Sequence, residues 1–384
     1  MPARLQGRYI AGDKLIRKYI MALPAPRPGI LDIKPYKPGA SEAPGAVEVH
    51  KLSSNESALG ASPDAMKAYA AAANKMFLYP DGGCTMLRQK IGSTYDLDPA
   101  CIVCGAGSDE ILQLLTRAYA GEGDNIIQSE HGFLVYALAA KSCGAEPRFA
   151  KEKNLTGDVD AMLELVDDRT RIVFVANPNN PTGTYIPDAE IRRLRAELRE
   201  DILLVIDAAY AEFMDEADYA DGAAMVEEFD NVVMTRTFSK IYGLAALRLG
   251  WGYCPPAVAD VLNRIRGPFN VTMAAQIAGI AALEDQDFVQ QNLTFNREER
   301  DFLQQQFGGM GLEFVPSYGN FVLVKFPDAP GRTADDILAY LKLNGVIVRE
   351  MHPYGLNEYL RISVGPRAGN RKLIELLGKK FSNG

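Results

Sequence analysis

Short apolar runs alternate with longer helix-like stretches through the middle of the chain, from about residue 101 to residue 254. The runs are rich in β-branched residues and bounded by Gly, Pro, Asp or Asn, as is typical of strands buried on both faces. We therefore expect an α/β domain with a mostly parallel sheet covered by helices on both faces. Seven strands are predicted, beginning at Cys101, Asn125, Glu146, Arg171, Ile202, Asn231 and Arg248.

The pattern changes after this region. Residues 270–306 are rich in Ala, Gln, Glu and Arg and lack strand signals, which predicts a helical connection. Apolar runs then begin at Phe321, Val346 and Tyr359, and residues 333–344 between the first two are helix-like. This arrangement is typical of a smaller α+β domain.

These patterns divide the chain into three regions. Residues 24–45 are rich in Pro and Gly, which predicts an extended arm. We expect an amino-terminal arm or extension over residues 1–47, a large domain over 48–285, and a small carboxyl-terminal domain over 286–384 that packs with part of the arm. Residues 1–20 could be an extension before a start at Met21, and they carry no part of the fold argument.

Composition limits the class of protein. The hydrophobic content of 47% and charged content of 23% are ordinary for a globular protein. A formal net charge of −8 argues against a nucleic-acid-binding surface. No segment approaches the roughly 18 uninterrupted apolar residues that a membrane-spanning helix needs. Small-molecule substrates are therefore expected, with no nucleic acid and no membrane as partners.

The cysteines favour the cytoplasm. Five are scattered along the chain, which does not resemble the disulfide framework of a secreted domain. Cys101 and Cys104 have half-zinc-site spacing, but no second pair of ligands follows. We expect both to be buried strand cysteines, and no metal site.

The strongest chemical signal is Thr237-Phe-Ser-Lys240, after a predicted strand and shortly before Arg248. A buried lysine beside another cation is favoured in its neutral form, as Schiff-base formation with an aldehyde cofactor requires. Thr237, Ser239 and Arg248 could bind a phosphate through hydroxyls and a guanidinium. For a Ser-Lys pair alone, a solvated surface lysine is the simpler alternative.

Three more segments carry candidate chemistry. Asp207-Ala-Ala-Tyr210 ends the most apolar strand, so its carboxylate would face the ligand crevice and keep a pyridine nitrogen protonated. The segment from Asn177 to Gly183 is a tight turn, and the segment from Gly105 to Glu110 could hold phosphate at a helix N-terminus. Each alone also fits an ordinary loop or helix cap.

Together and in this order, the four segments resemble the fold-type-I aminotransferases of class I and II, over nearly the whole chain from about Ile30. The resemblance implies pyridoxal 5′-phosphate bound to Lys240 as a Schiff base, with Asp207 at the pyridine nitrogen and Asn180 and Tyr210 at the ring hydroxyl. Lys240, Asp207 and Tyr210 are the expected catalytic residues. Residues implied around the cofactor phosphate are Gly107, Ser108, Asp109, Thr237, Ser239 and Arg248.

The same resemblance places Phe133 against the cofactor ring, where an aromatic side chain would stack. His131, two residues earlier, is expected to support the site from outside rather than to act in catalysis. Phe133 departs from the tyrosine that is common in the subfamily described next.

Shorter motifs resemble the histidinol-phosphate aminotransferase subfamily. They are Ile33 to Gly39, Leu52 to Glu56, Tyr79-Pro-Asp, Val348-Arg349 and Leu360 to Gly365. The resemblance implies a homodimer with an active site shared between subunits, in which Tyr79 reaches the cofactor phosphate of the partner subunit. The implied substrate-binding residues are Tyr36, Asn55, Asn180, Arg349 and Arg361.

The resemblance therefore implies ping-pong transfer from L-histidinol phosphate to 2-oxoglutarate, giving imidazole-acetol phosphate and glutamate. A broad-specificity aromatic aminotransferase, acting on tyrosine and phenylalanine, is the main alternative. A decarboxylase or lyase could use the same lysine, since the cofactor stabilises whichever carbanion the protein orients. A cofactor-sensing regulator would need a nucleic-acid-binding domain, which the acidic chain does not suggest.

Overall fold

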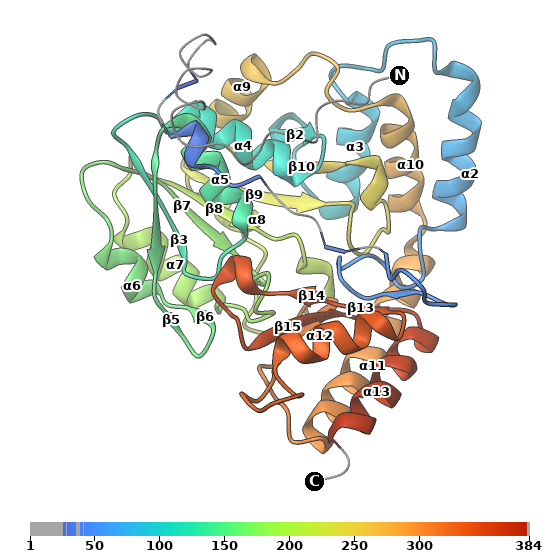
Figure 1. Ribbon diagram of the computed structural model, residues 1–384. Coiled ribbons are helices and arrows are strands. Elements are labelled where there is room, and N and C mark those ends of the chain that lie inside the picture. Colours follow the sequence, from blue (N-terminus) through green and yellow to red (C-terminus); the bar gives the residue numbers. More distant parts are fainter. Residues whose placement is uncertain (1–25, 28, 36–38, 41, 382–384) are drawn as a thin grey trace, which may run out of the picture.

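The computed structural model describes residues 26–27, 29–35, 39–40 and 42–381. A larger α/β unit lies above a smaller unit formed by the carboxyl-terminal elements (Figure 1). Tyr36 lies outside the described residues, as does the stretch of residues 1–20.

The large unit contains the expected mostly parallel sheet. Its seven strands run in the order β2-β10-β9-β8-β7-β3-β4, and β10 alone is antiparallel to its neighbours. All seven predicted strands are thereby confirmed. They are β2 (Ile102–Gly105), β3 (Asn125–Ser129), β4 (Glu146–Ala150), β7 (Thr170–Ala176), β8 (Leu203–Asp207), β9 (Val232–Thr237) and β10 (Gly250–Tyr253).

Alternate strand residues enter different cores on the two faces of this sheet. In β7, Ile172 and Phe174 join one hydrophobic cluster, whereas Val173 and Val175 join the other. The first face is covered by α4 (Ser108–Tyr119), α5 (Leu134–Cys143) and α9 (Pro256–Ile265). The second is covered by α2 (Pro63–Ala72), α3 (Thr85–Tyr95), α6 (Val159–Glu164), α7 (Asp188–Glu197), α8 (Ala223–Glu228) and α10 (Met273–Glu284).

One detail of the first strand differs from expectation. Cys104 is buried in β2, but Cys101 is only partly buried and lies in a short 3-10 helix, Pro99–Cys101. Asp98 caps that turn through the backbone N–H of Ala100, and Pro99 is suited to a first helical position. The prediction that both cysteines are buried strand residues was therefore wrong for Cys101.

The small unit is built on an antiparallel sheet with the order β11-β12-β15-β14. The expected helical connection into it consists of α10 and a second helix, α11, which begins after Asp285. The remaining elements are α11 (Gln286–Gly309), β11 (Glu313–Phe314), β12 (Phe321–Lys325), α12 (Ala334–Leu343), β14 (Arg349–Glu350), β15 (Tyr359–Ser363) and α13 (Arg367–Phe381).

The segment that leads into the large unit also contacts the small one. Strand β1 (His50–Lys51) pairs in parallel with β13 (Val346–Ile347), and the next residue, Leu52, is fully buried in the small unit's core. A separate hairpin joins β5 (Glu152–Lys153) to β6 (Thr156–Gly157). The domain limits at residues 47/48 and 285/286 stay a prediction.

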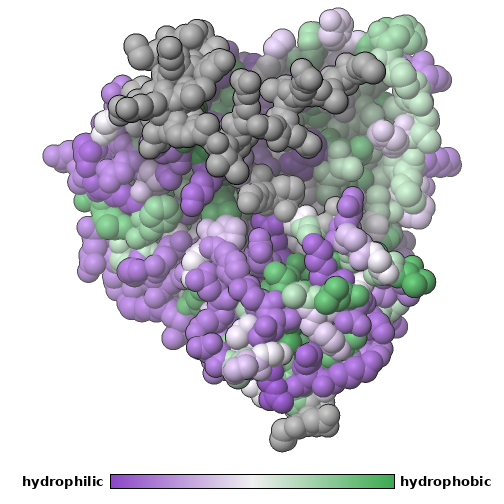
Figure 2. All heavy atoms as spheres, viewed as in Figure 1, coloured by the Kyte–Doolittle hydropathy of each residue, from purple (hydrophilic) through white to green (hydrophobic). Residues whose placement is uncertain are grey.

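Polar residues cover much of the visible surface, whereas apolar residues gather along the edge where α2 lies (Figure 2). Within the described part of the chain, no helix combines the length and apolar character needed to cross a membrane.

Candidate active site

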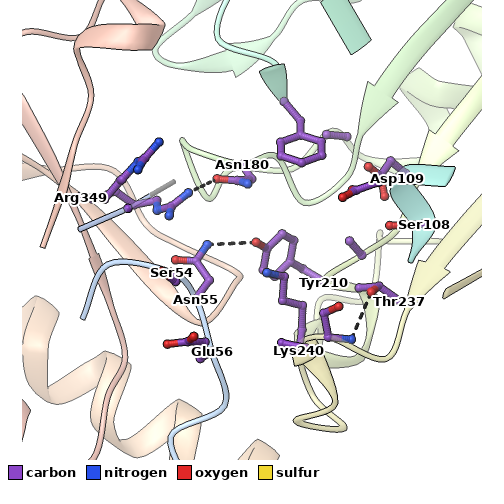
Figure 3. Close-up of a pocket in the computed structure, with 18 of the residues that line it drawn as sticks. Ser54, Asn55, Glu56, Ser108, Asp109, Asn180, Tyr210, Thr237, Lys240 and Arg349 are labelled. Atoms are coloured by element: carbon purple, nitrogen blue, oxygen red, sulfur yellow. Dashed lines mark hydrogen bonds between the residues drawn. The ribbon is translucent and has the colours of Figure 1, made fainter. Parts of the chain in front are cut away.

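A cavity of about 290 Å³ opens between the carboxyl ends of the large-sheet strands and the small unit (Figure 3). The carboxyl edge of a parallel sheet is where open α/β folds bind ligands. Most of the site residues predicted from the sequence line it: Asn55, Ser108, Asp109, Phe133, Asn180, Asp207, Tyr210, Thr237, Ser239, Lys240, Arg248, Arg349 and Arg361.

An anion-binding cradle closes one end of the cavity. Helix α4 begins here after Gly107, which has φ 86° and provides no side-chain cap, so backbone N–H groups of the first turn face the site. A Cβ atom at Gly107 would displace the Arg248 guanidinium from its present position, and the positive φ also favours glycine here. Arg248 donates to Ser239 Oγ at 3.4 Å and to Asp109 Oδ2 at 3.3 Å.

Lys240 lies at the centre, partly buried, in the turn that follows β9. Its Nζ is 5.5 Å from the centroid of the Tyr210 ring. Thr237 Oγ1 accepts a hydrogen bond from the backbone N–H of Ser239, which fixes the first part of the turn. The carbonyl of Lys240 accepts from Gly243, whose φ is 67°. Side chains from the ends of β8 and β9 thereby meet around one amine.

Asp207 lies at the end of β8 and is almost fully buried. Oδ2 accepts a 2.7 Å hydrogen bond from Tyr136 and Oδ1 accepts a 3.2 Å bond from Thr235. Burial raises the pKa of Asp207 to about 6, although these two hydrogen bonds act in the opposite direction. A cationic group bound against Asp207 would therefore stabilise its ionised form and lower its pKa.

Aromatic side chains form the wall above this carboxylate. Phe133 contacts Tyr136 edge-on at 5.8 Å between ring centroids, and Tyr136 stacks on Phe174 at 4.6 Å. Phe133 itself is half-exposed to the cavity. A planar ligand ring placed here would lie against Phe133 with its edge near Asp207.

Arg361 and Arg349 make the opposite end of the cavity basic. Arg361, on β15, donates a 2.5 Å hydrogen bond to Asn180 Oδ1 and a 3.1 Å bond to the carbonyl of Ser53. Arg349 is on the neighbouring strand β14 and pairs in register with Arg361. Two buried guanidinium groups on adjacent strands suit a carboxylate or phosphate ligand.

Two predicted residues lie elsewhere. Tyr79 is 80% exposed, stacks on Phe269 at 4.7 Å and does not line the cavity of its own chain. His131 forms a 2.8 Å pair with Glu152 and its carbonyl accepts from Asn179 in the turn that carries Asn180.

The cavity also has lining residues that the sequence did not single out. Glu56 and Ser54 come from the segment after β1, and Tyr354 comes from the turn after β14. Tyr136 supports Asp207 from behind. A helical spacing of three from Phe133 is the one signal that could have pointed to Tyr136.

The sequence profile of the family described as "Aminotransferase class I and II" matches residues 47–377. The chain belongs to this family. A histidinol-phosphate aminotransferase of Maricaulis maris is 57% identical over 92% of this chain and 97% of the relative. One of Rhodospirillum centenum is 53% identical over 93% of this chain and 99% of the relative.

A solved structure agrees with these relatives. The histidinol-phosphate aminotransferase of Sinorhizobium meliloti, in complex with pyridoxal-5′-phosphate, matches with a TM-score of 0.81 and 28% identity. The match covers 87% of this chain and 92% of that one. The prediction of a fold-type-I aminotransferase is confirmed.

Proposed function

We propose that this enzyme is a pyridoxal-phosphate-dependent histidinol-phosphate aminotransferase, with 2-oxoglutarate as the amino acceptor. One observation carries the proposal: a single cavity joins Lys240 and the buried carboxylate of Asp207 to the paired guanidinium groups of Arg349 and Arg361. The first two suit amine transfer, and the arginines suit an anionic substrate end. The 57% identity to the Maricaulis maris enzyme supports the particular substrate.

The residues present fit the cofactor. Its phosphate would be held by the first turn of α4 with Thr237, Ser239 and Arg248, where Gly107 leaves room for the guanidinium. Asp207 would pair with the pyridine nitrogen, and Phe133 would cover the ring. Asn180 and Tyr210 both line the cavity and would contact the ring hydroxyl.

Each residue then has a separate task in the reaction. When bound, the cofactor supplies an aldehyde for the amine and a ring that accepts electrons. Lys240 is the base that would remove the proton from the substrate carbon that bears the amine and later return a proton. Asp207, ionised against the pyridine nitrogen, would keep that nitrogen protonated. Tyr210 would donate a hydrogen bond to the ring oxygen.

Substrate binding falls to the small unit. Arg361 would hold the anionic end of the substrate with Arg349, while Asn180 orients its guanidinium. Asn55 lines the same part of the cavity, and Tyr36 of the arm is proposed to complete the site. Because a guanidinium can donate paired hydrogen bonds to either a phosphate or a carboxylate, the same arginines can bind histidinol phosphate and then 2-oxoglutarate.

A second candidate function is that of a broad-specificity aromatic aminotransferase, since Arg361, held by Asn180, could also bind the α-carboxylate of an amino acid. The test is a half-reaction titration of the purified yellow enzyme, following loss of its absorption band with each amino donor. We expect much higher efficiency with histidinol phosphate than with tyrosine, phenylalanine or aspartate. Comparable efficiency with the aromatic amino acids would overturn the substrate assignment.

We propose further that the enzyme is a cytoplasmic homodimer with shared active sites. The five cysteines are free, as a reducing compartment favours. Residues 76–79 expose Met, Phe, Leu and Tyr side chains, at 80% for Phe77 and Tyr79, close to the apolar edge along α2. An apolar patch of this kind suits a protein interface. Tyr79 would cross that interface to the partner's cofactor phosphate.

A further inference from the structure

Tyr210 is held by a buried chain of hydrogen bonds that begins in the small unit. Asn55 Nδ2 donates to the Tyr210 hydroxyl oxygen at 3.0 Å (Figure 3). Ser363 Oγ donates to Asn55 Oδ1 at 2.7 Å and accepts from the backbone N–H of Asn55 at 2.8 Å. Asn55, Ser363 and Tyr210 are 0%, 3% and 3% exposed, so these bonds are sheltered from water.

The backbone fixes the direction of this chain. A peptide N–H can only donate, so Ser363 Oγ must accept from Asn55, and its own proton is directed to Oδ1. The amide of Asn55 is then oriented with its NH₂ group toward Tyr210. A flipped amide would put two N–H groups on Ser363 Oγ and deprive the hydroxyl proton of its acceptor. Tyr210 therefore accepts from Asn55, and its own proton is free to point into the cavity.

Asn55 suits this task for a conformational reason as well. Its φ of 53° lies in the left-handed region, which asparagine adopts more readily than most residues. Asn320 Nδ2 donates to the carbonyl of Asn55 at 3.0 Å, which holds the segment from a third direction. Both ends of the Asn55 side-chain amide therefore have partners within the protein, Ser363 at Oδ1 and Tyr210 at Nδ2.

We infer that Ser363 and Asn55 are positioning residues that make Tyr210 a hydrogen-bond donor to the ring oxygen of the bound cofactor. This inference rests on the proposed function. Asn55 would then orient the Tyr210 hydroxyl, whereas the sequence resemblance implied that it binds the substrate directly. Ser363 lies two residues after Arg361 on β15. The strand that would bind the substrate anion would therefore also orient the Tyr210 hydroxyl toward the cofactor.

The direction of the Tyr210 proton would have a measurable consequence in the cofactor-loaded enzyme. A proton directed at the ring oxygen would stabilise negative charge there, and the nitrogen that joins Lys240 to the cofactor would then hold its proton less tightly. Three charged groups lie near this chain of hydrogen bonds. Lys240 is 5.5 Å from the centroid of the Tyr210 ring, and Arg361 is 5.5 Å from that of the Phe321 ring, which packs on Tyr210. Glu56, the residue after Asn55, lines the same cavity and pairs with Lys51 at 2.7 Å.

The experiment is a pH titration of the yellow absorption band in the cofactor-loaded enzyme. With Ser363→Ala, Asn55 can turn and Tyr210 loses its fixed orientation. We expect the titration midpoint to rise by about one pH unit, the equivalent of one hydrogen bond to a charged group. Tyr210→Phe should raise it at least as far. Ser363→Thr keeps the hydroxyl and should leave the midpoint near that of the wild type.

The double variant separates positioning from general loosening. If Ser363 acts through Tyr210, Ser363→Ala should cause no further shift in the Tyr210→Phe background. Ser317→Ala is the matched control, because Ser317 is also 3% exposed and its hydroxyl bonds only to the Phe321 carbonyl and the Gly319 N–H among the hydrogen bonds described. It should reduce stability without moving the midpoint.

Two results would overturn the inference: an unchanged midpoint in folded Ser363→Ala, or equal shifts in the presence and absence of the Tyr210 hydroxyl. Failure of the proposed function would look different. An enzyme without the yellow band would refute the cofactor assignment, and a normal band with no response to histidinol phosphate would refute the substrate, whatever the midpoint.

Discussion

Tyr136 donates a 2.7 Å hydrogen bond to Oδ2 of Asp207, and both side chains are buried beneath the wall of the active site. The bond orients the carboxylate but does not compensate for its burial, since the pKa of Asp207 is still raised to about 6. The site is therefore prepared for a cationic partner that the protein alone does not provide. A protonated pyridine nitrogen is such a partner.

This arrangement predicts a pH-dependent stability in the cofactor-free enzyme. Because the pKa of Asp207 is higher in the folded state than its ordinary 3.8, its contribution to stability is complete below about pH 4. That contribution is lost as the pH rises through about 6, at a cost of about 3 kcal/mol. Urea unfolding at pH 4.5 and 7.5 should show about 2 kcal/mol of this loss in the wild type, because the rest has already occurred by pH 4.5, and a smaller loss in Asp207→Asn.

The exposed Asp328 provides the control. Asp328→Asn should leave the wild-type pH dependence unchanged. If Asp207→Asn shows the same dependence as the wild type, the carboxylate is not the group that titrates. The same variant should also bind the cofactor but transfer amines poorly, because an uncharged amide cannot keep the pyridine nitrogen protonated.

Lys240→Ala tests the reacting amine. The variant should bind pyridoxal phosphate without the yellow band and lose amine transfer by on the order of a thousandfold or more, as expected when nucleophile and base are removed together. Absorption spectra and single-turnover assays would measure the two effects. Lys153→Ala, on the exposed β5–β6 hairpin, should behave as the wild type. Normal turnover by Lys240→Ala would refute the assignment.

Site residues that directly follow a strand could be predicted from the sequence. Asp207 and Lys240 could be predicted because the carboxyl ends of parallel strands meet at one edge of a sheet, so local motifs there share a site. The number of the main strands and their positions along the chain followed from short apolar runs with clear boundaries. These features depend on residues close together in the chain.

Contacts between distant segments could not be predicted in this way. Asn55 and Ser363 are 308 residues apart, and their hydrogen bonds depend on the segment after β1 lying beside β15, where the Ser363 N–H also donates to the Leu52 carbonyl. Tyr136 reaches Asp207 because α5 packs on the face of the sheet beneath it. Leu52 is buried in the small unit's core, a contact between distant segments that local sequence patterns do not reveal.

A buried ion pair behind the site should dominate local stability. Arg236 Nη1 lies 3.2 Å from Glu212 Oε1, and the guanidinium also contacts Asp221 and the face of Tyr95. Burial raises the pKa of Glu212, whereas Arg236 lowers it. Arg236→Met leaves an unpaired buried carboxylate and should cost about 3–5 kcal/mol of unfolding free energy.

The loss of stability in Arg236→Met should be larger at pH 8 than at pH 5. At pH 5 the unpaired Glu212 can take up a proton, whereas at pH 8 it must stay ionised although burial has raised its pKa. Urea unfolding at both pH values would measure it. Arg192→Met removes an exposed pair with Glu228 and should have little effect at either pH. Equal losses for the two variants would contradict the argument.

Arg361→Lys tests the anion clamp. The lysine keeps the charge but cannot contact Asn180, the Ser53 carbonyl and a substrate anion at once, as the planar guanidinium can. We expect kcat/KM for histidinol phosphate to fall by about tenfold to a hundredfold, mainly through KM. Arg367→Lys, at an exposed position, is the control. An unchanged KM would place the substrate anion elsewhere.

The proposed dimer can be tested at Phe77. Its side chain is 80% exposed within the chain, so Phe77→Asp should leave the fold intact while placing a charge in the apolar patch. Light scattering during gel filtration should then show a monomer with little activity. Leu343→Asp changes an equally apolar residue that is 78% exposed on α12, and this variant should remain dimeric.

Hybrid dimers would show whether Tyr79 acts across the interface. Tyr79→Ala lacks the tyrosine but keeps Lys240, and Lys240→Ala lacks the amine but keeps the tyrosine. A mixed dimer would contain one complete site, because the tyrosine of one subunit serves the lysine of the other. Mixing the two weakly active variants should therefore restore up to about a quarter of wild-type activity from random pairing. No recovery in a mixture shown to exchange subunits would place Tyr79 in its own subunit's site.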